Sequence, residues 1–153
     1  MSNQRRFRDH GETVYDFRDE FLVICPRCSA CAYVVPLPNA EQLVPVAAKI
    51  VCPACGLNNV QPVQTLVLHN SARDWYFHLP LWLQTPCCGH ILWARNRAQL
   101  AFLVDYVGAK LREDVPNINQ SLVSRLPRWL KSAKNRADVL HGVERLKQKA
   151  ATF

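Results

Sequence analysis

Hydrophobic and polar residues alternate in short runs through the first two thirds of the chain. Runs of four to eight apolar or alternating residues, bounded by proline, glycine or cysteine, are typical of β-strands. On this pattern we expect strands at residues 13–17, 21–24, 31–35, 48–51, 64–69, 74–79, 81–84 and 91–94. Residues 36–46 contain three prolines and are expected to form a loop, because proline donates no hydrogen bond to a sheet.

The pattern changes to a helical spacing after residue 95. Asn96 predicts a helix N-cap, and Gln99, three residues later, predicts a capping box. Apolar residues then recur every three or four positions, which predicts a helix over 97–113. Residues 114–119, with Pro116, are expected to end this helix and to form a linker.

A second helical region is expected from about residue 120 to the end of the chain. Ser124 is a candidate cap, and Asn135 with Asp138 predicts a break near 135. One apolar stripe is expected to continue across that break. It comprises Leu126, Trp129, Leu130, Ala133, Ala137, Leu140 and Val143.

These patterns predict an α+β fold. Residues 13–94 would form an antiparallel, metal-pinned β-ribbon or small sheet, and residues 95–153 two or three α-helices, after a flexible segment at 1–12. A chain of 153 residues with 49% hydrophobic content is long and apolar enough to bury a core.

Two Cys-x-x-Cys hooks carry the strongest chemical signal. The first is Cys25-Pro26-Arg27-Cys28, and the second, 23 residues later, is Cys52-Pro53-Ala54-Cys55 followed by Gly56. The gap of two residues lets both sulfurs of a hook reach one ion at about 2.3 Å. Four thiolates leave no open ligand position, so the spacing predicts one structural zinc ion and no catalytic metal.

The segment from Cys25 to Cys55 resembles a zinc ribbon of the transcription-factor type. That resemblance implies a zinc-bound β-ribbon and leaves the function open, because zinc ribbons serve many purposes. Residues 81–90 and 124–136 also resemble sequences of bacterial proteins described only as containing a zinc ribbon. This wider resemblance implies a bacterial, cytoplasmic protein and brings no activity with it.

The remaining cysteines allow three interpretations. Residues 85–89 echo the second hook, with Thr85 in the place of its first cysteine. Cys87 or Cys88, together with His90 and with Cys31, His69 or His78, could form a second metal site. Alternatively these cysteines are small buried residues of a diverged turn, or the adjacent thiols of Cys87 and Cys88 undergo oxidation.

Charge is concentrated toward the C-terminus. The net charge is +7, and residues 91–153 contain twelve basic and five acidic residues. A basic face on the second helical region could lie along a phosphate backbone of DNA or RNA, or could be a solvated helix face. The candidate contact residues are Arg125, Arg128, Lys131, Lys134 and Arg136.

The aromatic residues could stack on unpaired bases or fill the core, and the core is the favoured interpretation. They are Trp75, Tyr76, Phe77, Trp82 and Trp93.

Together these features favour a non-enzymatic zinc module, an adaptor that binds nucleic acid or its machinery. The alternative is a protein-interaction module without nucleic-acid binding, and a redox or metal-dependent enzyme is a weaker third. No nucleophile–base pair, carboxylate pair or glycine-rich phosphate loop is evident. Seven cysteines without a secretory signal favour reduced thiols in the cytoplasm, and we expect no membrane segment.

Overall fold

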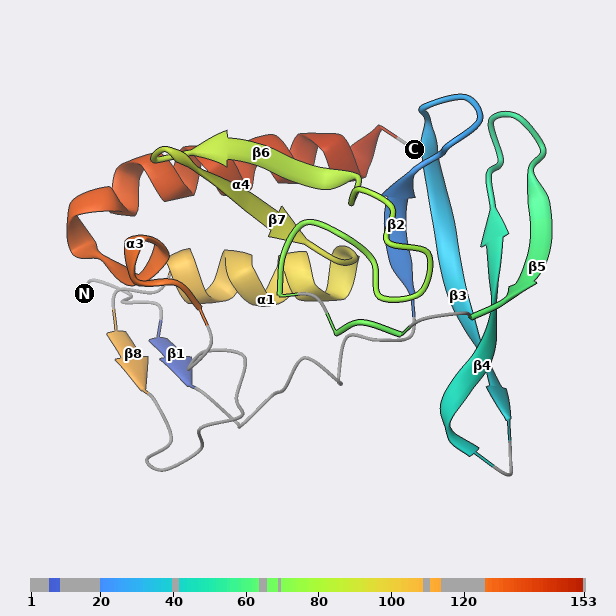
Figure 1. The fold of residues 1–153 in the computed structure, drawn as a ribbon. Helices are drawn as coiled ribbons and strands as arrows, with labels where there is room; N and C mark the ends of the chain where they lie inside the picture. Colours follow the sequence, from blue (N-terminus) through green and yellow to red (C-terminus); the bar gives the residue numbers. More distant parts are fainter. Residues whose placement is uncertain are drawn as a thin grey trace.

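The computed structural model describes residues 6–8, 20–39, 42–63, 66–68, 70–108, 111–113 and 126–152. The predicted α+β fold is confirmed: a four-stranded antiparallel sheet stands beside a two-stranded hairpin and its helices (Figure 1). The expected strand at 13–17 and the linker at 114–119 lie outside the described residues.

The four-stranded sheet, here called the ribbon sheet, has the strand order β2-β3-β4-β5. Its strands are β2 (Phe21–Ile24), β3 (Cys31–Asn39), β4 (Gln42–Val51) and β5 (Asn58–Pro62). Every neighbouring pair is antiparallel. β2 is apolar at all four positions and its first three residues are fully buried, whereas β5 is exposed along its whole length, including Val60 at 54%.

The predicted loop at 36–46 is wrong, because most of it belongs to β3 and β4. Pro36 pairs with Ala48, and the register shifts between Leu37 and Asn39, next to Pro38. The pairing of β3 with β2 stops at Val34, so among the described strands none pairs with this edge of β3 beyond Val34. A proline is tolerated there, because its missing N–H can face this edge or a bulge.

The predicted strand at 74–79 is also wrong, because a buried carboxylate folds this segment into a tight loop. Asp74 accepts hydrogen bonds from the backbone N–H groups of Tyr76 and Phe77 at Oδ1, both at 2.8 Å, and from that of Leu79 at Oδ2. An aspartate that caps its own loop competes with strand pairing. The described part of the expected strand at 64–69, residues 66–68, is irregular.

Residues 85–89, which are similar in sequence to the second hook, lie at the tip of a β-hairpin and do not form a metal knuckle. Its strands are β6 (Leu83–Cys87) and β7 (His90–Ala94), and Cys87 pairs with His90 across the turn. Cys88 and Gly89 form the two-residue turn with φ of 54° and 76°. Two positive φ angles are typical of a type I′ turn, which matches the twist of a hairpin. The similarity of residues 85–89 to the second hook is therefore explained by the geometry of a hairpin turn.

The first helix, α1 (Arg97–Gly108), begins where predicted but ends early. Asn96 Oδ1 accepts from the N–H of Gln99 at 2.9 Å, so the N-cap is confirmed. The Gln99 side chain accepts from the N–H of Arg95, one residue before the position that a capping box requires. Residues Leu111–Glu113 form β8, which pairs in parallel with β1 (Arg6–Arg8), so the predicted helix to 113 is too long.

The C-terminal region is broken, as predicted, and its described part, residues 126–152, contains α3 (Arg128–Lys131), the 3₁₀ turn η2 (Ala133–Asn135) and α4 (Arg136–Ala151). Ser132, between the first two, is extended with φ −67° and ψ 129°. Asn135 makes no side-chain cap; its amide donates to the carbonyl of Trp129 instead. The predicted cap Ser124 lies outside the described residues.

The predicted apolar stripe is confirmed at Leu130 and Val143, which are both 4% exposed, and is wrong at three positions between them. Leu140 is 38% exposed, and Ala133 and Ala137 are also exposed. The break before α4 changes the helix rotation, so one stripe cannot be extended from residue 126 to residue 143. The buried residues of α4 are Val139, Gly142, Val143 and Leu146.

The hairpin β6–β7 packs against α4, and α4 also packs directly against α1 (Figure 1); these four elements are here called the helix–hairpin unit. α4 approaches the hairpin closely at Gly142, where an added Cβ would lie 2.9 Å from Leu92 Cδ2 and 3.3 Å from Cys87 Sγ. The favoured core interpretation of the aromatic residues is confirmed for Trp75 and Tyr76, which are 2% and 4% exposed.

Backbone hydrogen bonds join the ribbon sheet to the helix–hairpin unit at β2. The N–H of Leu22 donates to the carbonyl of Arg95 at 2.8 Å, and its carbonyl accepts from the N–H of Trp82 at 2.9 Å. Val23 also forms an antiparallel bridge with Leu81. Within the described part of the chain, none of the helices has the length and apolarity needed to cross a membrane.

Candidate metal centre

The first cysteine hook forms a compact turn, here called the first knuckle (25–30), between β2 and β3. The N–H of Cys25 donates to the carbonyl of Ala30 at 2.7 Å, and the N–H of Ser29 donates to the carbonyl of Cys25 at 2.9 Å. The N–H of Arg27 lies 3.4 Å from Cys25 Sγ. A backbone N–H directed at a sulfur stabilises the thiolate form, which is the form that binds metal.

The second hook repeats this arrangement between β4 and β5, as the second knuckle (52–57). The N–H of Cys52 donates to the carbonyl of Leu57 at 2.7 Å, and the N–H of Gly56 donates to the carbonyl of Cys52 at 2.9 Å. Gly56 has φ 78°, and Ser29 has φ 64° at the same position of the first knuckle. The left-handed conformation is natural for glycine, so the first knuckle carries a small strain at its serine.

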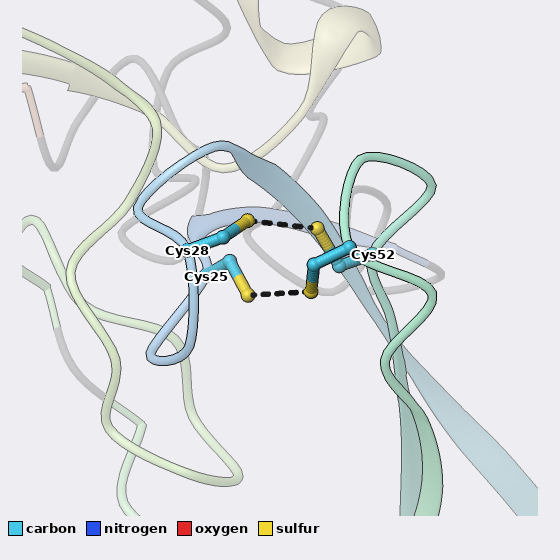
Figure 2. Close-up of side chains that lie close together, drawn as sticks. Cys25, Cys28 and Cys52 are labelled. Carbon is cyan, nitrogen blue, oxygen red and sulfur yellow. Dashed lines mark hydrogen bonds between the residues drawn. The ribbon is translucent and has the colours of Figure 1, made fainter.

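The two knuckles face each other and bring the four sulfurs together (Figure 2). The ligand atoms of Cys25, Cys28, Cys52 and Cys55 all lie within 4.8 Å of one another. Two sulfur pairs run between the knuckles, Cys25–Cys55 at 3.8 Å and Cys28–Cys52 at 3.5 Å. A tetrahedral ion with bonds of about 2.3 Å holds its sulfurs ~3.8 Å apart. The four thiols therefore fit one metal ion.

The electrostatics of the four thiols favour the binding of a cation. Burial opposes ionisation of Cys25, but hydrogen bonds from the backbone at Arg27 and Cys28 and from the other thiols outweigh it and lower its pKa to about 7. At Cys28 a backbone hydrogen bond at Ala30 favours the thiolate, while desolvation and the thiols of Cys52, Cys55 and Cys25 prevail and raise its pKa to about 12. Crowded thiols resist joint ionisation, and a bound cation removes that resistance.

Cys31 does not join this cluster. It is the first residue of β3, is 6% exposed, and directs its Sγ toward its neighbour's carbonyl, that of Ala32, at 3.9 Å. Burial raises the pKa of its thiol to about 12. The position fits the predicted alternative of a small buried residue.

The proposed second metal site is not brought together in the described structure. Cys87 and Cys88 lie 3.6 Å apart at Sγ, but His90 stacks on Trp129 at a centroid distance of 5.0 Å. Burial raises the pKa of Cys87 to about 11, and its thiol points to the carbonyl of Asp138 on α4. Among the described residues, the four cysteines of the knuckles are the group of three or more ligands that could hold an ion. The other candidate, His69, lies outside them.

The predicted basic face is divided by the break in the C-terminal region. Arg128 and Lys131 lie on the single turn of α3, Lys134 on η2, and Arg136 begins α4. Arg128 and Lys134 are exposed, whereas Lys131 and Arg136 are half-buried. Arg125 lies outside the described residues. The four described candidates therefore do not form the continuous face of one helix.

Two basic residues of α4 hold the helix on the hairpin. Arg145 Nε donates to Thr85 Oγ1 at 3.0 Å, and Lys149 Nζ donates to the carbonyls of Trp82 and Gln84 at 3.1 and 2.9 Å. Burial lowers the pKa of Lys149. These two cations contribute to packing, which the sequence pattern did not reveal.

A cleft beside the metal centre was not predicted. Its lining residues are Pro26, Arg27, Ile50, Leu57, Asn59, Gln61, Pro62, Tyr76, Phe77, His78 and Leu79. They come from both knuckles, from β4 and β5, and from the loop that Asp74 folds. No linear motif joins positions this far apart, so only the fold could reveal them.

Comparisons do not place the metal centre in a known family. No protein family, curated protein or solved structure matches this chain. Its function is therefore inferred from its own geometry and chemistry.

Proposed function

We propose that the protein is a non-enzymatic zinc-ribbon module in which Cys25, Cys28, Cys52 and Cys55 bind one structural Zn²⁺. The observation that carries the proposal is the position of the four sulfurs, within 4.8 Å of one another and with two spacings close to a tetrahedral edge. A tetrahedral set of four thiolates is typical of zinc. Zinc, when bound, closes the two knuckles on each other and contributes folding free energy.

The centre favours a structural ion over a catalytic one. All four donors are thiols, and Cys25 and Cys52 are 1% exposed. Four protein ligands leave no position for water or substrate. The knuckle backbones hold the sulfurs in place, and the centre positions the ends of β2, β3, β4 and β5.

Metal counting by native mass spectrometry tests this proposal. The wild-type protein should carry one zinc equivalent, and Cys28→Ser with Cys52→Ser should remove it. The matched control is Cys31→Ser with Cys88→Ser, which changes two cysteines outside the cluster and should retain one equivalent. A double variant at Cys28 and Cys52 that still carries zinc would contradict the proposal.

Nucleic acid is the partner that the charge favours. The net charge is +7, and Arg128, Lys131, Lys134 and Arg136 lie within nine residues of sequence on three successive elements, with Arg128 and Lys134 exposed. Basic residues in such a group neutralise phosphates and release counterions. The module would then use zinc for its shape and its basic residues for affinity.

A salt series tests this partner. Arg128→Gln with Lys134→Gln should weaken binding of DNA or RNA and reduce the slope of log affinity against log salt by about 0.7 to 0.9 per lost phosphate contact. Lys49→Gln with Lys147→Gln removes the same charge elsewhere and serves as control. Absence of binding at low salt would contradict nucleic-acid binding and direct the search to a protein partner.

A further inference from the structure

A cleft of about 810 Å³ opens between the ribbon sheet and the loop at 73–80, beside the metal centre. One wall consists of β4 and β5, and the other of residues 76–79. The first knuckle adds Pro26 and Arg27 at one end. The volume lies within the range of small-molecule sites, roughly 300 to 1,000 Å³.

The polar groups of the cleft suit an anionic ligand with hydrogen-bonding edges. Arg27 is exposed and His78 half-buried, and no carboxylate is among the described residues that line the cleft. Asn59 and Gln61 alternate on β5, so both side chains lie on the face that the cleft uses. A guanidinium binds phosphate, and amides both donate and accept hydrogen bonds, as the edge of a nucleobase requires.

The remaining lining is apolar and contains an aromatic ring that can stack. Phe77 is half-buried, while Tyr76 is 4% exposed and is held edge-on against Phe21 at a centroid distance of 5.6 Å. Ile50 and Leu57 line the opposite side. A flat ligand can therefore lie between an aromatic ring and an aliphatic surface.

The loop wall is preformed. The Asp74 carboxylate is fully buried, and its two oxygens accept hydrogen bonds from three backbone N–H groups of the loop. Arg73 Nη1 donates to the carbonyl of His78 at 2.8 Å, and His78 has φ 58°. A left-handed, non-glycine residue persists only where its surroundings enforce it, and such residues are common at binding sites.

We propose that this cleft binds one nucleotide unit, with the base against Phe77 and the amides of Asn59 and Gln61 and the phosphate on Arg27. The proposal rests on nucleic-acid binding as the function and places an unpaired base beside the metal centre. The ligand chemistry is shared by a free nucleotide and by one unit of a single strand. Because Arg27 lies between two metal ligands and Leu57 closes the second knuckle, binding requires the metal-loaded protein.

The experiment compares two neighbouring asparagines on β5. Asn59→Asp places a carboxylate in the cleft, whereas Asn58→Asp places the same charge on the other face of the same exposed strand. The zinc-loaded full chain is titrated with a labelled ten-nucleotide single strand, and separately with the four mononucleotides while chemical shifts are recorded. We expect Asn59→Asp to weaken binding of the strand by about tenfold or more and Asn58→Asp to change it less than about threefold.

A second variant examines stacking. Phe77→Ala should weaken binding by roughly 5- to 150-fold, the range measured when a stacking aromatic is removed. Thermal melts confirm that each variant is folded before its affinity is compared. Shift changes at Asn59 and Phe77 with a mononucleotide would assign the cleft to free nucleotides, and changes only with the strand would assign it to a strand unit; both support the proposal.

The contrary outcomes separate the two proposals. If the wild type binds the strand and Asn59→Asp and Phe77→Ala bind it equally well, the cleft proposal is overturned and nucleic-acid binding stands. Equal losses for Asn58→Asp and Asn59→Asp also overturn it, because strand charge alone would then explain them. If the wild type binds neither probe at low salt, both proposals fail.

Discussion

The ribbon sheet and the helix–hairpin unit are stabilised in different ways. The ribbon sheet ends in an edge strand, β5, that is exposed at every residue, and its two knuckles bring four thiols together. The helix–hairpin unit encloses Leu83, Leu92, Leu103 and Leu146, each at most 1% exposed. The two regions share one hydrophobic core, to which β2, β3 and β4 also contribute, and we expect the exposed end of the ribbon sheet to depend most on an added link.

Two similar turns show the difference most directly. Residues 52–56 and 85–89 differ at two positions, Cys52 against Thr85 and Ala54 against Cys87. Cys52 directs its sulfur toward Cys28 across the centre, while Thr85 accepts a hydrogen bond from Arg145 of α4. The same turn chemistry, with glycine at a positive φ, thus serves a metal centre in one region and helix packing in the other.

Removal of the metal should have the largest effect and should separate the two regions. Chelation should abolish amide protection in residues 25–55 and lower the melting temperature, because zinc binding supplies about 10 kcal/mol or more in small zinc modules. Amides of α4 should keep more protection than those of β4 and β5. Hydrogen exchange with mass spectrometry measures both. An unchanged melt and uniform protection would show that the ribbon sheet does not depend on a metal.

A cavity in the helix–hairpin unit should produce the reverse pattern. Leu146 is fully buried, so Leu146→Ala should destabilise the protein by about 2 to 5 kcal/mol while metal content stays the same. Leu140→Ala, at a position 38% exposed on the same helix, is the control and should cost much less. Denaturant unfolding measures the free energies. Equal costs at the two positions would refute the observed phase of α4.

The loop at 73–80, which Asp74 stabilises, lies beside the ribbon sheet and leads into the hairpin. Substitution of Asp74 should therefore reduce the stability of both regions. Asp74→Ala leaves three backbone N–H groups without their acceptor and should cost about 2 to 4 kcal/mol. Asp74→Asn keeps one carbonyl oxygen as an acceptor and should lose less stability than Asp74→Ala. Thermal and urea unfolding rank the three proteins, and a neutral Asp74→Ala would exclude the carboxylate as the organiser of the loop.

The smallest effect is expected at the hairpin turn. Cys88 has φ 54° at a position where asparagine is favoured, so Cys88→Asn should stabilise the protein by up to ~1 kcal/mol. Metal content should remain at one equivalent per chain. If the wild type instead carries a second zinc equivalent that this variant lacks, Cys88 is a metal ligand and the second metal site exists.

Sequence patterns correctly predicted those features of the fold that depend on residues close together along the chain. The two hooks, the N-cap at Asn96 and the strand at 21–24 each follow from a few adjacent side chains, and each is confirmed. The strand predicted at 74–79 failed, because alternation of aromatic and polar residues could not show that Asp74 would bind three amides of its own loop. The helix predicted to 113 failed for a related reason: residues 111–113 pair with β1, more than a hundred positions earlier.

The sequence by itself determined the α+β class and the set of four cysteines that cluster, because spacing and periodicity are local properties of a chain. Only the tertiary structure decided which cations are exposed and which pack, as Arg145 and Lys149 bind hairpin groups about sixty positions away. It also decided that Arg27, Asn59 and Phe77 share one cleft. Such proximity arises only when sheets and loops pack together. The spacing of these residues along the chain does not predict it.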